Sequence, residues 1–254
     1  MTRVKAVPLH TSAAIAEAAM AVPYPEDAGA FMAGHLTGQV VTRTRILRHW
    51  SDLSVAVVDD GGAVLARGLT VPLDAGVEGR DPFPDGGWEQ AVLWSIDDLL
   101  EERTPDTLCA LEIVVHPRAA RQGVSRLVLA GMRALARERG FRRLIAPLRP
   151  PLKANEPWAA MDEYAARRRD DGLPQDPWLR THVRAGGRLR GVAYRSTTIT
   201  AGLERWRAWT GLPLDRDGLV AVPGGLAPLL VNRDLDLGCY VEPNVWVDHP
   251  LDAD

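Results

Sequence analysis

The alternation of hydrophobic and polar positions along the chain predicts a sheet whose strands are interleaved with helices. Two apolar runs, residues 53–58 and 63–71, flank the turn-forming sequence Asp59-Asp60-Gly61-Gly62, which is typical of an antiparallel hairpin. Apolar side chains recur at helical spacing over residues 88–103, and residues 108–115 then form an apolar run of strand length. This part of the chain therefore predicts a hairpin, a helix and a third strand.

A second helix follows that third strand. Residues 123–139 carry one apolar stripe, and Gly140 stands where a C-terminal helix glycine is expected. Residues 141–147 give the next strand. A strand, a helix and a strand in this order make a parallel crossover beside the hairpin. We therefore expect an α/β (α+β) fold, with a mixed, mostly antiparallel central sheet that contains one parallel strand–helix–strand unit.

The remaining segments extend this unit at both ends. We expect helices over 13–20, 27–50, 158–169 and 177–185, another helix early in the tail, and strands over 188–200, 226–231 and 240–247. Residues 151–178 are rich in proline and charge, which indicates an insertion or a lid. An exposed edge strand at 240–247 would permit a homodimer, so the sequence is compatible with a monomer or a homodimer.

Composition and charge narrow the classes of function. The 254 residues carry a formal net charge of -3, so no global basic field favours nucleic acid or anionic lipid as a partner. Cys109 and Cys239 form neither a zinc-ligand spacing nor a disulfide framework, and they fit a reducing cytoplasm. Pro8 and Glu17 interrupt what would otherwise resemble a signal peptide, and no run approaches the roughly 20 apolar residues of a membrane span.

The strongest candidate for chemistry is the stretch LEIVVHPRAARQGVSRLVL, residues 111–129, where an apolar strand meets a basic turn and then a helix. Backbone N–H groups at a helix N-terminus lack helical partners, and together with the helix dipole they favour phosphate. Gly123 allows close approach of an anion, Ser125 offers a hydroxyl, and Arg118, Arg121 and Arg126 add positive charge. The turn is therefore predicted to bind a phosphate group.

Several common sites are excluded by their missing residues. The turn lacks the second glycine and the lysine of a P-loop, and it lacks the GxGxxG of a dinucleotide-binding turn. The chain has no GxSxG nucleophile elbow. His116 has no second ligand at a metal-binding spacing, so we predict no metal site.

The segment VVHPRAARQGVSRLVLAGMRALARERGFRRLIAP, residues 114–147, resembles the acyl-coenzyme A binding segment of the GNAT-type N-acetyltransferases. Val115 and Pro117 match the family's strand end, and Gly123 matches the central glycine of its [QR]-x-x-G-x-[GA] turn. Ala120 and Ser125 depart from that turn. The resemblance implies acetyl-CoA or another acyl-CoA as co-substrate. It also implies that the coenzyme contacts the following residues: Val114, Val115, Arg118, Arg121, Gln122, Gly123, Val124, Ser125 and Arg126.

The resemblance also bears on domain organisation. The order of helices and strands resembles that of the family over roughly residues 50–200. This implies a single acyltransferase domain over residues 1–254. The insertion at 151–178 and a C-terminal extension at 203–254 go beyond the minimal family core. Both additions are expected to shape the acceptor pocket.

Transfer of an acyl group to an amine needs a base for the ammonium proton and an acid for the departing thiolate. Glu112 is the only ionisable residue between positions 108 and 115, where the family often places its base; the alternative is a structural ion pair, for example with an arginine of the insertion. His182 stands four residues before Gly186, where the family often has a tyrosine acid, and it could equally be a core or surface histidine. Tyr164 is the rival acid.

These features together predict an acyl-CoA-dependent N-acyltransferase whose acceptor is a small-molecule amine that attacks the thioester directly. Two alternatives are open from the sequence. One is an enzyme of the same fold with another acyl donor or acceptor, such as a hydroxyl, an aminoacyl group or a decarboxylated thioester. The other is a coenzyme A binding module without turnover.

Overall fold

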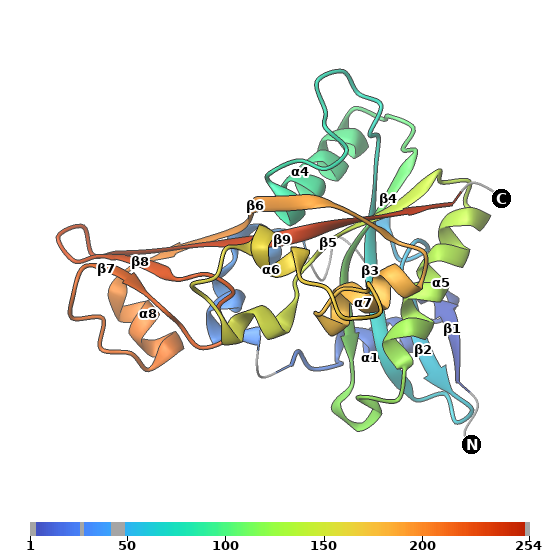
Figure 1. Ribbon diagram of the computed structural model, residues 1–254. Coiled ribbons are helices and arrows are strands. Elements are labelled where there is room, and N and C mark those ends of the chain that lie inside the picture. Colours follow the sequence, from blue (N-terminus) through green and yellow to red (C-terminus); the bar gives the residue numbers. More distant parts are fainter. Residues whose placement is uncertain (1–3, 26–27, 42–48, 252–254) are drawn as a thin grey trace.

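The computed structural model describes residues 4–25, 28–41 and 49–251, and it is built around one nine-stranded sheet (Figure 1). The strands run in the order β1-β2-β3-β4-β5-β9-β8-β7, and β6 pairs with β9. Their bounds are β1 Val4–Pro8, β2 Val55–Asp59, β3 Val64–Leu73, β4 Thr107–Val115, β5 Arg143–Leu148, β6 Arg188–Ala201, β7 Gly218–Val220, β8 Leu229–Asn232 and β9 Leu237–Pro250. The helices are α1 Ala13–Met20, α2 Leu36–Val41, α4 Gly87–Leu100, α5 Val124–Glu138, α6 Met161–Ala166, α7 Pro177–Arg184 and α8 Leu203–Thr210.

The pairing of the strands confirms the predicted fold class. β4 and β5 are parallel, and α5 connects them; the other strand pairs are antiparallel. The sheet is thus mixed and mostly antiparallel, with one parallel strand–helix–strand unit at its centre. A β1 strand at residues 4–8, which the sequence pattern did not predict, extends the sheet beyond the hairpin of β2 and β3.

The two parallel strands diverge soon after they begin. β4 pairs with β5 only at Thr107–Cys109, opposite Arg143–Ile145, whereas β5 pairs with β9 along its whole length. From residue 110 to the end of β4, the edge that faces β5 therefore has no strand beside it in the ladder. This V-shaped opening in the middle of the sheet is the feature that positions the site.

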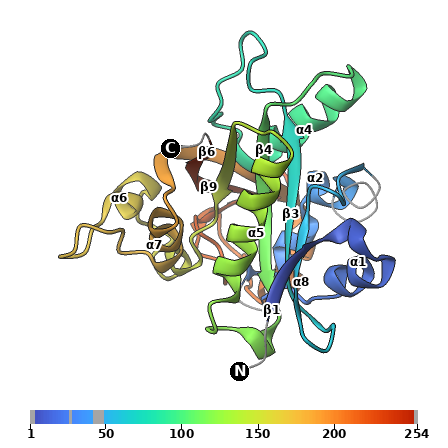
Figure 2. The same cartoon turned by 90° about the vertical axis from the view of Figure 1, so that its right-hand side faces the viewer.

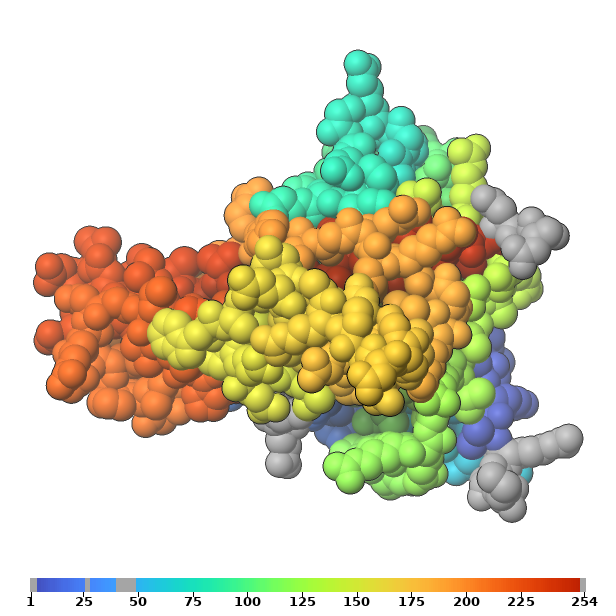
Figure 3. Space-filling view, viewed as in Figure 1, coloured from blue at the N-terminus to red at the C-terminus, as the bar shows by residue number. Residues whose placement is uncertain are grey.

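Helices cover both faces of the sheet. Figure 2, which views β3 and β4 nearly edge-on, shows α5 and α7 on one side and α1 and α2 on the other. α5 packs on β1 to β5 through a buried stripe that includes Val128, Met132 and Leu135, as its apolar pattern predicted. In the space-filling view, the yellow and orange segment from residue 150 to 185 covers much of the sheet beside α5 (Figure 3).

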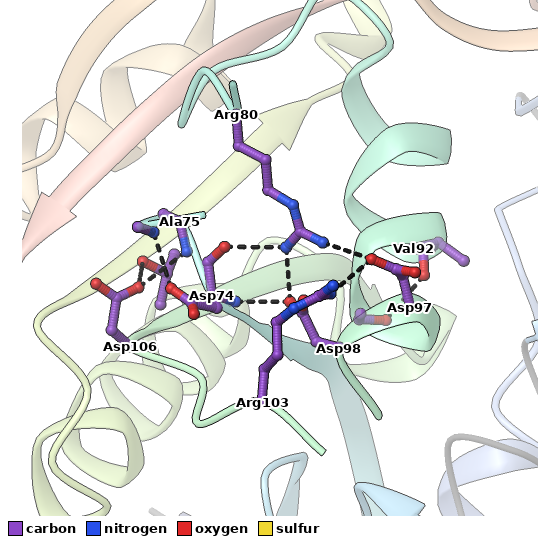
Figure 4. Close-up of polar contacts among 11 residues, drawn as sticks. Asp74, Ala75, Arg80, Val92, Asp97, Asp98, Arg103 and Asp106 are labelled. Carbon is purple, nitrogen blue, oxygen red and sulfur yellow. Dashed lines mark hydrogen bonds and ion pairs between the residues drawn. The ribbon is translucent and has the colours of Figure 1, made fainter. Parts of the chain in front are cut away.

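An ion-pair network fixes α4 at its C-terminal end (Figure 4). Asp98 is 3 % exposed and accepts hydrogen bonds from Arg80 Nη1 at 2.8 Å, Arg103 Nη1 at 2.9 Å and the Asp74 amide at 2.7 Å. Burial alone would raise the pKa of Asp98, but these donors hold it below its ordinary value. The loop between β3 and α4 is thereby tied to the helix.

The N-terminal end of α4 is held against β6. The Trp88 amide donates to Ser196 Oγ at 2.9 Å, and Ser196 Oγ donates to Asn244 Oδ1 at 2.6 Å. Gly87 has a φ of +49°, and a Cβ there would lie 2.7 Å from the Ser196 Cα. Only glycine therefore fits this position, and the contact sets the direction in which α4 leaves the sheet.

The C-terminal part of the chain builds a second hydrophobic core. β7, β8 and α8 form an arm with the far ends of β6 and β9, at the left of Figure 1. Phe31, Trp206 and Tyr240 pack together at the centre of this arm, with ring centroids 4.8 to 6.4 Å apart. The expected helix in the tail and its strands are thus present, with β7 in addition.

The prediction of an exposed edge strand at 240–247 is wrong. β9 lies inside the sheet, with β6 on one side and β5 and β8 on the other. The helix predicted over 27–50 is replaced, where it is described, by a 3₁₀ turn at Ala30–Gly34 and by α2; residues 26–27 and 42–48 lie outside the described part. In the part of the chain that the structure describes, no helix is long and apolar enough to cross a membrane.

Candidate active site

The basic turn, which we define as residues 116–125, follows the open end of β4 and leads into α5. Arg121 and Gly123 both have left-handed backbone conformations, with φ values of +62° and +77°. A Cβ on Gly123 would meet no atom within 4 Å, so the space above this glycine is open. Successive residues of alternating handedness turn their N–H groups toward one point, which makes a concavity suited to an anion.

The amides of this turn are free to bind a ligand. Within the described part of the chain, no hydrogen bond engages the N–H groups of residues 121–125. The turn itself is braced, because His116 Nδ1 accepts from the Arg118 amide at 3.2 Å and Gln122 Nε2 donates to the Arg118 carbonyl at 2.9 Å. The candidate coenzyme residues are thus gathered around one braced turn at the N-terminus of a 15-residue helix.

A hollow of about 270 Å³ lies between the first turns of α5 and the end of α7. Its lining residues are Arg126 and Leu129 of α5 together with Thr181, Arg184 and Ala185 at the end of α7. Val114 is buried, while Val115 and Ser125 are half-buried and Arg118, Arg121, Gln122 and Arg126 are exposed.

A β-bulge interrupts β4 beside the opening. Leu69 of β3 pairs with Glu112 and Thr70 pairs with Ala110, so Leu111 is the extra residue. The carbonyl of Leu111 accepts a hydrogen bond from Trp88 Nε1 at 3.1 Å, and the Trp88 ring lies 5.1 Å from that of His35. The bulge thus links the centre of the sheet to the N-terminus of α4.

Glu112 forms an ion pair, which was one of the two predicted alternatives for this residue. Its partner is Arg67 of β3 and not an arginine of the insertion. Arg67 Nε lies 2.5 Å from Glu112 Oε1, and the Tyr24 hydroxyl donates to Glu112 Oε2. The Glu112 side chain is 16 % exposed. An ion pair of this kind does not exclude proton transfer, because each oxygen keeps a free lone pair; the role of Glu112 as base stays a prediction.

Two further carboxylates, Glu242 and Glu89, are held by hydrogen bonds and ion pairs. Glu242 of β9 is 1 % exposed and bonds to Arg149 Nε at 2.9 Å and to the Tyr240 hydroxyl at 2.6 Å. Glu89 of α4 pairs with His35 and accepts from the Thr198 amide at 3.2 Å.

Two of these three carboxylates bond directly to the segment at residues 19–25 and 28–35, and the third reaches it through its arginine partner. Glu112 bonds to Tyr24, Glu89 bonds to His35, and Arg149 of the Glu242 pair donates to the Ala28 carbonyl at 3.4 Å. The segment after α1 is therefore one wall of an acidic region that borders the bulge.

His182 does not reach the basic turn. It is 1 % exposed, and its Nδ1 lies 3.0 Å from Nε2 of His249 on β9. Burial and then the neighbouring His249 lower the pKa of His182 to about 3, so the ring is neutral at physiological pH. A neutral imidazole is a poor proton donor, and the acid role of His182 stays a prediction that its burial disfavours.

Tyr164 is also engaged elsewhere. Its hydroxyl donates to Asp176 Oδ2 at 2.8 Å, and Asp176 Oδ1 caps α7 by accepting from the amides of Trp178 and Leu179. Burial and this hydrogen bond raise the pKa of Tyr164 above its ordinary value. Its acid role likewise stays a prediction, and the contacts it makes support the N-terminus of α7.

Sequence reasoning missed Tyr24, Arg67 and Trp88. A signal for one of them was present: Arg67 is the only charged residue in the apolar run at 63–71, just as Glu112 is in the next strand. Two lone opposite charges on neighbouring apolar strands favour each other, because an unpaired buried charge is costly. Tyr24 and Trp88 lie in loops or at a helix start, and nothing in the linear sequence indicates their partners.

The described residues contain no group of three or more histidine, cysteine, aspartate or glutamate side chains placed to hold a metal ion. No family model matches the sequence. It is, however, 34 % identical to arginine N-acetyltransferase avaD of Aspergillus versicolor. The alignment spans 209 residues, which are 74 % of this chain and 71 % of that relative.

Solved structures agree with this relative at the level of the fold. The loading GNATL domain of CurA from Lyngbya majuscula superimposes with a TM-score of 0.56 at 12 % identity, over 99 % of this chain and 98 % of that domain. The GphF GNAT-like decarboxylase in complex with isobutyryl-CoA superimposes with a TM-score of 0.52 at 16 % identity, over 98 % and 100 %. The chain therefore belongs to the GNAT superfamily of acyl-CoA-dependent N-acetyltransferases.

Proposed function

We propose that the enzyme transfers the acetyl group of acetyl-CoA to the amine of arginine or of a closely related small cationic molecule. The observation that carries this proposal is the placement of Glu112 on the bulged strand, between the basic turn and Tyr24 of the segment after α1. The similarity to an arginine N-acetyltransferase over most of both chains supports the same acceptor class.

The basic turn fits the diphosphate of the coenzyme. Among the described residues, no hydrogen bond is found from the five amides at residues 121–125, and the space above Gly123 at this helix N-terminus is open. Arg118, Arg121 and Arg126 add positive charge around them, as the resemblance implied. Acetyl-CoA, when bound, supplies the activated acyl group, and the unpaired edge of β4 offers backbone N–H and C=O groups to the part of the coenzyme that crosses the opening.

Glu112 is proposed as the group that takes the proton. The acceptor enters as an ammonium, loses one proton to a Glu112 oxygen, and its nitrogen lone pair then attacks the thioester carbonyl. The new C–N bond forms as the C–S bond breaks; coenzyme A leaves as the thiolate and takes up the second proton, which the amide nitrogen releases. No side chain is acylated on this route.

The acidic region supports a cationic acceptor. Arg67 and Arg149 balance Glu112 and Glu242, whereas Glu89 is paired with a histidine and keeps one oxygen without a hydrogen bond among the described residues. A guanidinium or ammonium group is therefore better matched to this region than a neutral or anionic acceptor.

We also propose that the enzyme works as a single domain in the cytoplasm, as a monomer or a homodimer, and without a metal. Its cysteines are unpaired: Cys109 is buried, and Cys239 is half-buried on β9. Two free thiols are usual in a reducing compartment.

Calorimetric binding of acetyl-CoA tests the coenzyme half of the proposal. We expect micromolar affinity for the wild type, which corresponds to about -8 kcal/mol. Gly123→Asp should weaken binding roughly 100-fold or more, because it places a carboxylate where the amides converge.

Gly140→Asp is the matched control for this variant. Gly140 lies at the other end of α5, has a φ of +79° against +77° for Gly123, and also has open space around its Cβ position. Both variants carry the same backbone strain and the same added charge. Equal losses of affinity in the two variants would remove the basic turn as the diphosphate site.

A further inference from the structure

Arg67 is buried and bonds both to the Glu112 carboxylate and to the backbone at the end of α1. Only 1 % of the residue is exposed, and its Nε bonds to Glu112 Oε1 at 2.5 Å. Its Nη1 donates to the carbonyls of Ala19 at 3.0 Å and Val22 at 2.6 Å, in and just after the last turn of α1. The guanidinium thus joins Glu112 to the start of the segment that borders the acidic region.

Tyr24 completes the enclosure of the same carboxylate. Its hydroxyl donates to Glu112 Oε2, and the Arg67 guanidinium carbon lies 4.8 Å from the centre of its ring. The residue is 49 % exposed, and its hydroxyl and ring contact Glu112 and Arg67 respectively. Burial and then Glu112 raise the pKa of Tyr24 above its ordinary value, so the hydroxyl remains a donor at physiological pH.

The two donors hold Glu112 from opposite oxygens. In the described part of the chain, the charged or titratable groups bonded to Glu112 are Arg67 of β3 and Tyr24 of the segment after α1. From α4, the indole N–H of Trp88 bonds to the neighbouring Leu111 carbonyl and not to Glu112. Two charge-assisted hydrogen bonds fix the plane of a carboxylate, and each oxygen keeps a lone pair for a proton.

We propose that Arg67 and Tyr24 are positioning residues that orient the Glu112 carboxylate toward the acceptor amine and tie that orientation to the segment after α1. This inference rests on the proposed function, because it acts only through Glu112 as the base. Neither residue contacts the acceptor or the coenzyme in this account. Removal of either one should therefore lower kcat and leave the KM for acetyl-CoA unchanged.

A double-mutant cycle measured with acetyl-CoA and L-arginine tests this role. Tyr24→Phe alone should lower kcat roughly tenfold or more, the value of a hydrogen bond to a charged group. In a Glu112→Gln background the same change should lower kcat by less than about twofold, because the group that Tyr24 orients is gone. A purely structural tyrosine would give the same factor in both backgrounds.

Two further variants keep the test independent of misfolding. Tyr194→Phe is the matched control, since Tyr194 is 55 % exposed on β6 and its hydroxyl has no partner among the described residues; it should keep the wild-type kcat. Arg67→Lys keeps the charge but loses the fork that reaches both Glu112 and the α1 carbonyls, so it should lower kcat as Tyr24→Phe does.

The outcomes separate the inference from the proposed function. A large fall in kcat in Glu112→Gln, with residual turnover that Tyr24→Phe lowers by the same factor as in the wild type, would overturn the positioning role and leave the proposed base intact. Unchanged turnover in Glu112→Gln would overturn both the base and the residues that act through it. Absence of turnover in the wild type with every amine tested would refute the proposed function itself, and the positioning role with it.

Discussion

Acidification from pH 7 to pH 5 should destabilise the fold through the buried pair His182 and His249. Burial lowers the pKa of His182 to about 3, and burial followed by the charge of Arg133 lowers that of His249 to about 4, against a smaller opposing effect of Asp248. An unfolded histidine titrates near 6.5, so the unfolded chain binds more protons than the folded one below that pH. The stabilisation is complete above about pH 6.5 and is lost as the pH falls.

The magnitude follows from proton linkage. Between pH 7 and pH 5 an unfolded histidine gains about 1.9 kcal/mol of protonation free energy, while a folded one with a pKa of 3 or 4 gains almost none. The pair should therefore cost about 4 kcal/mol of unfolding free energy, a large part of the roughly 5–15 kcal/mol typical of a folded protein. Carboxylates add little in this window, because their unfolded pKa lies near 4.

Urea unfolding followed by tryptophan fluorescence at pH 7 and pH 5 measures this loss directly. The comparison is with His249→Gln, which removes one of the two titrating groups. The wild type should lose about 4 kcal/mol between the two pH values and the variant about 2 kcal/mol, whatever their stabilities at pH 7. An equal loss in both proteins would refute the reasoning that the pair is buried in neutral form.

Three other variants, two of them with a matched control variant, test how the site is held in place. Gly87→Ala should cost about 2–4 kcal/mol by thermal unfolding, from backbone strain and the clash with β6, whereas Gly62→Ala, with a φ of +80° and open space, should cost about 1–2 kcal/mol. Asp98→Ala should cost about 3–5 kcal/mol, because it removes the buried carboxylate that bonds to Arg80, Arg103 and the Asp74 amide. Asp97→Ala, whose side chain is 53 % exposed, should cost less than about 1 kcal/mol. Tyr164→Phe should lower stability by about 1 kcal/mol and leave kcat unchanged; a large fall in kcat would instead support its role as the acid.

The fold could be predicted from the sequence where local signals agreed with one another. The boundaries of the central strands and of α5 were predicted to within about two residues. The signals were the hairpin turn at residues 59–62, the apolar stripe of α5 and the glycine at 140. Long-range pairing was less accessible. β9 was expected at an edge because an apolar run alone does not say how many neighbours a strand has, and it has three.

The candidate site, like the fold, was predictable in its local features but not in its long-range contacts. The basic turn was predictable, because a glycine after a strand and before a helix has a local meaning. The partners of Glu112 were not, because they come from residues 24 and 67, which are brought together only by the tertiary fold. His182 matched a motif position, yet its burial depends on His249, which is 67 residues away in sequence.

The most direct test of the account is a turnover assay with acetyl-CoA and a panel of amines that includes L-arginine, with thiol release as the readout and mass spectrometry of the product. The account predicts release of coenzyme A that depends on a cationic amine, an N-acetylated product, and loss of turnover in Glu112→Gln with acetyl-CoA binding preserved. Tight binding of acetyl-CoA without acetylation of any amine in the panel would contradict it.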